Sequence, residues 1–402
     1  MLRRLSTDTR LGLRLAAALI LPLVTVLVLA VMQTSNRWRT ADDMGRASEL
    51  ARLSVKFGDV VHELQTERGM SAVFLGTGGQ QFATELPTQR SRTDGRRAAL
   101  TEAMGAITLD AYPSAVREAI TGGVAALRDL ESRRQEISAR SIDGPSSNRF
   151  FTETIATLLA VSREAVKSSA EPVVTTRLLA YSNYISAKER AGQERAAGSV
   201  GFAAGQFTSE QHQRFVALNA AQQAFLDTFE VYATGEQQTF ARATVVGQAV
   251  TDVERMRRIA IGTSPGTPLG DIAAAAWFNA TTARIDMMKT VENRLAADLE
   301  TYAAGEASAA WRGLTVAAAV TLTVVLLSIV MVSWIARGIT RSIGAVVARL
   351  RTLSDGDTES PIYGEGRKDE VGDIATAMAV FRDNLIRTRE MQEELKRKDE
   401  QA

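Results

Sequence analysis

The sequence reads Leu64-Gln65-Thr66-Glu67-Arg68-Gly69-Met70-Ser71 within a stretch that has helical periodicity. Apolar residues at 61, 64, 72 and 75 are spaced by threes and fours, which places them on one helix face. Arg68 falls on the same face. A guanidinium directed at a core costs free energy unless an anion meets it. The stretch therefore predicts a helical domain that contains an anion-binding residue.

A second segment repeats this pattern and reads Gly192-Gln193-Glu194-Arg195-Ala196-Ala197-Gly198-Ser199. Arg195 lies on one face with Ala191, Gly198 and Phe202. Each arginine is preceded by a glutamate and followed by a phenylalanine and a Gly-Gln group. We interpret the two segments as paired helices that each present an arginine to a shared interior.

Two further cations are candidates for the same interior. Arg284 lies on an apolar stripe with Trp277, Met288 and Val291, and Lys188 shares a face with Arg195. A structural alternative stays open for each, because such a side chain can also reach water or pair with a nearby carboxylate.

The crowded arginines at 255, 257 and 258 are predicted to form a solvated face. Isolated histidines at 62 and 212 suggest neither a metal site nor acid–base chemistry.

Composition narrows the remaining classes of protein. The chain has 402 residues, a net charge of +1 and no cysteine. The charge argues against a nucleic-acid partner, and the missing thiols exclude a cysteine nucleophile, a cysteine-based zinc site and disulfides. Helical periodicity runs almost throughout and no sustained period-two alternation occurs, so we predict an all-α fold. A break at residues 141–147 is expected to join two helical halves. No catalytic residue, metal or cofactor is expected.

Two apolar stretches, residues 15–33 and 314–336, are long enough to span a bilayer. Arginines precede the first stretch and follow the second, so residues 1–14 and the C-terminal end are predicted to be cytoplasmic. Residues 34–313 then form a domain outside the cytoplasm, in the periplasm. The expectation is a two-pass protein of the inner membrane.

Residues 337–389 contain two amphipathic helices joined by a short connector. The second helix carries Val371, Ile374, Met378, Phe381 and Leu385, a stripe with coiled-coil spacing. This region resembles the HAMP domain, and Asp369, Glu370 and Gly372 match its most specific motif. The resemblance implies a homodimer built on a parallel four-helix bundle. Residues 390–402 are expected to begin a helical signalling tail.

The two arginine segments and the helix around Arg284 resemble the nitrate- and nitrite-sensing (NIT) family over roughly residues 50–300. That resemblance implies helical bundles that bind nitrate or nitrite through arginines from more than one helix. Arg68 and Arg195 correspond to the family motif, whereas Arg284 is nominated mainly by its stripe. The planar fork of a guanidinium can donate to two oxygens of such an anion at once.

Together these features predict a dimeric transmembrane receptor, not an enzyme, that relays nitrate or nitrite binding through HAMP to a chemotaxis-type output. The input half of a sensor histidine kinase, acting through a downstream kinase, is one alternative. A helical membrane scaffold that only binds protein partners is another. The sequence leaves open whether nitrate, nitrite, chloride or a small carboxylate is bound, and whether the site lies within or between subunits.

Overall fold

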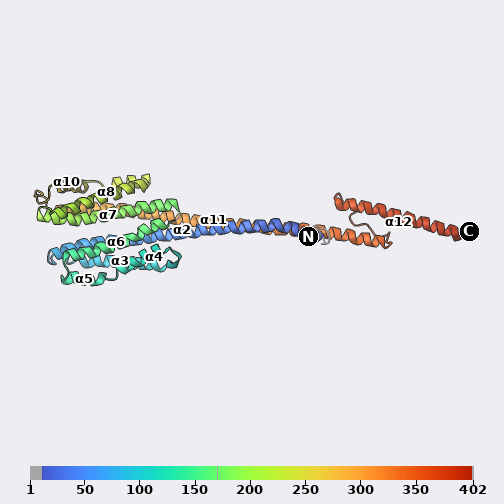
Figure 1. The fold of residues 1–402 in the computed structure, drawn as a ribbon, viewed down its shortest axis with the longest axis horizontal. Coiled ribbons are helices and arrows are strands. Elements are labelled where there is room, and N and C mark those ends of the chain that lie inside the picture. The colour runs from blue at the N-terminus through green and yellow to red at the C-terminus, as the bar shows by residue number, and fades with distance from the viewer. Residues whose placement is uncertain (1–10, 170, 401–402) are drawn as a thin grey trace. The chain divides into compact units, whose positions relative to one another are not determined.

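The computed structural model describes residues 11–169 and 171–400, and the side chains at 11–21, 23, 399 and 400 lie outside this description. Every regular element within the described residues is a helix (Figure 1). The expected all-α fold is confirmed for this part of the chain. It follows from apolar residues that recur at helical spacing without strand-like alternation.

The helices fall into two compact units. The larger unit contains residues 39–312, and the second unit contains the described residues before 39 and after 312. In chain order the elements are α2 (Leu11–Gly76), α3 (Glu85–Gly105), the 3₁₀ helix η1 (Leu109–Ala111), α4 (Ser114–Ala126), α5 (Leu130–Ala139), α6 (Gly144–Ser168), α7 (Pro172–Ala204), α8 (Ser209–Tyr232), α9 (Gly235–Thr244), α10 (Gln248–Gly262), α11 (Ala274–Ser354) and α12 (Glu370–Glu400).

The larger unit is built from two successive sets of helices (Figure 1). In the first set, α3 to α6 follow the later part of α2, and α4 packs against α6. In the second set, α8 to α10 and the start of α11 follow α7, and α7 packs against α8. Each set therefore opens with a helix that carries one of the two arginine segments.

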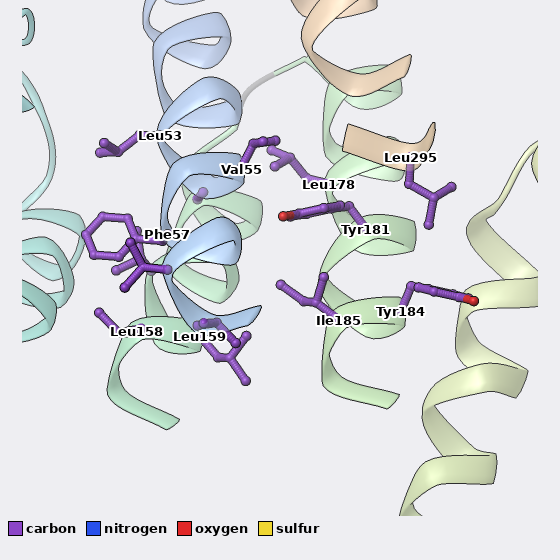
Figure 2. Packing of buried hydrophobic residues seen from close by; sticks show 14 of the residues in the cluster. Leu53, Val55, Phe57, Leu158, Leu159, Leu178, Tyr181, Tyr184, Ile185 and Leu295 are labelled. Carbon is purple, nitrogen blue, oxygen red and sulfur yellow. The ribbon is translucent and has the colours of Figure 1, made fainter. Parts of the chain in front are cut away.

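One hydrophobic core extends through both sets of helices. Figure 2 shows Val55 and Phe57 of α2 with Leu158 of α6, and Leu178 and Tyr181 of α7 nearby. All five side chains are buried. Burying one large apolar side chain contributes roughly 1.5–3 kcal/mol, so this shared core fixes the position of α2 relative to α7.

The boundary between the two sets lies later than the sequence suggested. Residues 141–147 were expected to join two helical halves, but α6 begins at Gly144 and packs back onto α4 of the first set. Asp143 Oδ1 accepts a hydrogen bond from the Ser146 backbone N–H at 2.6 Å and caps this new helix. The change of set therefore comes between α6 and α7.

The second unit has a small core of its own. Val346 of α11 is buried with Ile362 of the connector and with Ala375 and Met378 of α12. Arg349 of α11 fastens the connector, because its Nε donates to the Pro361 carbonyl at 3.1 Å and its Nη1 donates to the Asp357 carbonyl at 3.1 Å. The two helices thus form a single packed module.

Among the residues described, one helix, α11, contains a segment long and apolar enough to cross a membrane, with a mean hydropathy of 2.5. The first expected span, residues 15–33, belongs to α2. Its side chains at 15–21 and 23 lie outside the description. The arrangement with two membrane spans therefore stays a prediction.

Candidate anion site

The structure brings Arg68 of α2 and Arg195 of α7 together. A Cβ atom added at Gly69 would lie 2.9 Å from Nη2 of Arg195, and one added at Gly192 would lie 3.1 Å from Nη2 of Arg68. Each guanidinium therefore rests against a glycine of the opposite helix. Because glycine has no side chain, two long cations can occupy the space between α2 and α7. The sequence predicted this convergence but gave no distance.

Arg68 is paired with an acid from the other helix. Its Nη1 lies 2.7 Å from Oε1 of Glu189, and its Nη2 lies 3.1 Å from Oε2 of the same carboxylate. Thr152 of α6 accepts a third hydrogen bond at 3.1 Å, while Gln65 and Gln193 each donate to Glu189 at 2.7 Å. The Arg68 and Glu189 side chains are only 4% and 5% exposed. Arg68 therefore pairs with a carboxylate of the protein, as the structural alternative for this residue predicted.

Arg195 has no such acid. Its Nη1 donates to Thr282 Oγ1 of α11 at 2.9 Å, and its guanidinium lies 5.0 Å from the centre of the Phe278 ring. No carboxylate of the described chain lies within ion-pair distance of Arg195. Burial, followed by the charge of Arg68, lowers the pKa of Arg195 to about 10, although Asp286 and Glu189 act in the opposite direction. The cation persists at neutral pH and would be stabilised by an added anion.

The acid before each arginine is part of a buried ion pair that repeats in the two sets. Glu67 accepts from Nε and Nη2 of Arg134 at 2.7 and 2.9 Å. Glu194 accepts from Nε and Nη2 of Arg257 at 2.7 Å each. A third polar residue completes each pair, because Thr93 donates to Glu67 and Gln222 donates to Glu194. The sequence similarity between the segments therefore reflects a structural repeat.

The prediction that Arg257 belongs to a solvated face is wrong. Arg257 is 7% exposed because α10 turns it toward Glu194, whereas Arg255 remains on the surface. Sequence reasoning also missed Glu67 and Glu194 as buried acids. The available signal was their shared position directly before an arginine that faces the core.

Lys188 lies in a separate buried cluster. It forms an ion pair with Glu292 of α11, which Lys289 also contacts at 2.7 Å, and its Nζ lies 3.3 Å from Nδ1 of His62. Burial lowers the pKa of Lys188, and the Glu292 charge opposes that shift. Lys188 is therefore already neutralised by a carboxylate of the protein, and the proposed ligand site does not include it.

Arg284 is not brought to the Arg68–Arg195 pair. Thr282, which binds Arg195, lies two residues earlier on α11, so the two side chains project about 200° apart around the helix. Arg284 is 7% exposed and lines a different pocket with Tyr184 and Met288. Within residues 11–169 and 171–400, no side chains are grouped to hold a metal ion.

The acidic motif of the second unit shapes the start of α12. Asp369 Oδ1 accepts from the Gly372 backbone N–H at 3.2 Å, and the hydrogen bond from Arg367 lowers the pKa of Asp369 to about 2. Glu370 is the first residue of α12. A Cβ atom at Gly372 would lie 2.1 Å from the Arg367 carbonyl oxygen, so this position requires glycine.

Comparison with protein families identifies two matches. A family described as "Nitrate and nitrite sensing" matches residues 59–300, and the HAMP domain matches residues 334–387. The first match contains Arg68, Arg195 and Arg284. The second contains Asp369, Glu370 and Gly372.

Known proteins show the same relationship. The chain is 33% identical to a nitrate regulatory protein of Klebsiella oxytoca over 250 residues. The aligned stretch covers 61% of each of the two chains. The chain therefore spans about three fifths of the length of that curated relative. The solved structure of the NasR transcription antiterminator has 25% sequence identity and a TM-score of 0.62, covering 91% of this chain and 99% of that one.

Proposed function

This chain belongs to the nitrate- and nitrite-sensing (NIT) family and carries a HAMP domain, and we propose on that basis that it is a receptor for nitrate or nitrite. In the proposal, Arg68 and Arg195 hold the anion between α2 and α7. The observation that carries the proposal is Arg195, a cation beside Arg68 that lacks a carboxylate of its own.

The charge of the site favours a monovalent anion. Arg68, Arg195 and Glu189 together carry one net positive charge, because Glu189 already neutralises Arg68. Asp286 adds a weaker negative field, since it is exposed and water screens it. Nitrate and nitrite each carry one negative charge over coplanar oxygens, which suits the planar guanidinium fork.

The same arginine offers a route from the ligand to the output. Arg195 donates to Thr282 of α11, and Trp277 of α11 donates through Nε1 to the Arg195 carbonyl at 2.9 Å. Helix α11 continues to Ser354, where Arg349 and Leu353 pack in the HAMP module. An anion that repositions Arg195 would alter the contact between α7 and α11 and so bias the packing of HAMP.

The wider setting of the receptor is part of the proposal. Residues 15–33 and 314–336 would span the inner membrane and place residues 34–313 in the periplasm. HAMP would hold two copies together, and a chemotaxis-type or kinase output would receive the signal without an enzymatic step in this chain. The solved relative is named a transcription antiterminator, so the expectation of no nucleic-acid partner remains a prediction.

The decisive experiment titrates potassium nitrate or nitrite into the full chain in detergent, with potassium chloride as the salt control. We expect heat of binding and a higher melting temperature with nitrate. Arg195→Met should abolish both responses, and in the absence of ligand it should lower the melting temperature far less than Arg68→Met does. A wild-type chain that does not respond to millimolar nitrate or nitrite would instead support the scaffold alternative.

A further inference from the structure

The second set of helices contains a pocket of about 250 Å³ that the proposed nitrate site does not use. Four of its apolar wall residues come from three elements: Leu226 and Phe229 of α8, Val245 after α9 and Met288 of α11. Phe229 and Met288 are each 1% exposed. The walls can therefore bury apolar ligand atoms as well as they bury one another.

Arg284 lines this pocket and has no protein partner. It is 7% exposed, and neither a hydrogen bond nor an ion pair joins it to any residue that the structure describes, while Glu194 and Glu254 favour its charge only from beyond ion-pair distance. A buried guanidinium without an anion is costly, and the other buried arginines at 68, 134, 257 and 349 all have one or more carboxylate or carbonyl partners. A cation kept in this state is typical of a site that awaits a ligand.

Tyr184 supplies a second donor in the same pocket. It is 2% exposed and stacks edge-on against Phe229 at 4.9 Å, and Figure 2 shows it projecting from α7 toward the neighbouring helix. No hydrogen bond joins its hydroxyl to another residue of the described chain, and the hydroxyl is not fully buried, so a ligand can reach it. A phenol and a guanidinium beside apolar walls form the donor set that a carboxylate with an apolar tail requires.

The mouth of the pocket restricts the charge of its ligand. Asp227, Glu230 and Arg242 also line the pocket, and Arg242 neutralises Glu230 at 2.6 Å. The exposed carboxylate of Asp227 would repel a second negative charge on the outer end of a ligand. A larger pocket of about 420 Å³ near the start of α3 has no arginine that lacks a protein partner, because its Arg90 and Arg140 already donate to Ser138 and Gly78.

We propose that the pocket between α7, α8, α9 and α11 binds a small organic monocarboxylate, held by Arg284 and Tyr184, at a site separate from the Arg68–Arg195 pair. The carboxylate accepts from both donors and the apolar tail packs against Phe229 and Met288. Because both sites share α7 and α11, this ligand would reach the same helices as nitrate. The inference does not depend on nitrate binding.

The test uses the full chain in detergent with sodium benzoate and sodium butyrate as probes, and benzyl alcohol as the uncharged control. We expect benzoate or butyrate to raise the melting temperature and bind once per chain, and benzyl alcohol to have no effect. Arg284→Met should weaken benzoate binding at least tenfold, and Tyr184→Phe about threefold. If neither carboxylate binds, or if Arg284→Met binds benzoate like the wild type, the proposal fails.

Two further measurements separate this site from the nitrate site and from a structural role. Arg195→Met should retain benzoate binding, and loss of benzoate binding in that variant would assign the carboxylate to the Arg68–Arg195 pair instead. Without ligand, Arg284→Met should melt at a higher temperature, because it removes an unpaired buried charge. A lower melting temperature would show that Arg284 stabilises the fold and would overturn the inference.

Discussion

Helices α2 and α7 each place an arginine between them, yet the two arginines have different surroundings. Arg68 is held in a bidentate ion pair with Glu189, whereas Arg195 has only the Thr282 hydroxyl and the Phe278 ring. The facing helix explains the difference. Glu189 of α7 lies beside Arg68, whereas His62, at the corresponding position of α2, lies beside Lys188. Helix α7 therefore supplies an acid to the arginine of α2, and no acid of α2 pairs with Arg195.

This asymmetry separates two roles that the sequence had assigned equally. Burial, followed by the charge of Lys188, lowers the pKa of His62 to about 2, so His62 stays neutral beside Lys188 at physiological pH. Arg68 is thus part of the packed structure as well as of the proposed site. Arg195 is the arginine that an external anion would stabilise.

The largest expected effect is on the free energy of unfolding, and it comes from breaking the Arg68–Glu189 ion pair. Arg68→Met leaves Glu189 buried without its cation, and such a change costs about 3–5 kcal/mol of unfolding free energy. Arg195→Met removes a cation that has no acid and should cost far less. Denaturant unfolding of the two variants of the full chain measures the difference directly.

A double variant controls for lost packing. Arg68→Met combined with Glu189→Met should recover most of the stability, because no unpaired charge remains. Equal destabilisation by Arg68→Met and Arg195→Met would contradict the asymmetry between the two arginines.

The next effect comes from supplying the missing anion. Thr282→Asp places a carboxylate where the Thr282 hydroxyl accepts from Nη1 of Arg195 at 2.9 Å. The new carboxylate should pair with Arg195 and weaken nitrate binding at least tenfold, or about 1.4 kcal/mol. Thr282→Asn, which adds no charge, is the matched control in the same calorimetric titration. Equal nitrate affinity in the two variants would rule out this explanation.

The smallest effect concerns pH. An unfolded chain protonates His62 near pH 6.5, whereas the folded chain resists protonation until about pH 2. Between these values the unfolded state binds more protons, so His62 lowers stability as the pH falls below 6.5, by about 1.4 kcal/mol per pH unit at most. The groups that act on His62 come from α3, α7 and α11: Arg96, Lys188, Lys289 and Glu292.

The measurement compares the melting temperatures of the wild type and His62→Gln between pH 7 and pH 5. The loss of stability with acid should be smaller in His62→Gln. Identical pH profiles would show that His62 does not remain neutral as the structure requires.

Much of the fold and part of the site followed from periodicity. The 3.6-residue repeat predicted helices throughout and placed Arg68, Arg195 and Arg284 on inward faces, and motif similarity led to the NIT and HAMP families. The same reasoning misplaced the joint between the halves and put Arg257 in solvent. A repeat within one helix says nothing about the helix that will pack against it.

The sequence by itself determined which side chains leave their helix toward the interior, because that direction depends only on local spacing. The tertiary structure decided what each of them meets there. Glu189 came to Arg68 from 121 residues away, and Glu194 came to Arg257 from 63 residues away. Within the described chain, no carboxylate came within ion-pair distance of Arg195 or Arg284. The free energy of a buried charge is set by its partner, and partners so distant in sequence are fixed only when the helices pack.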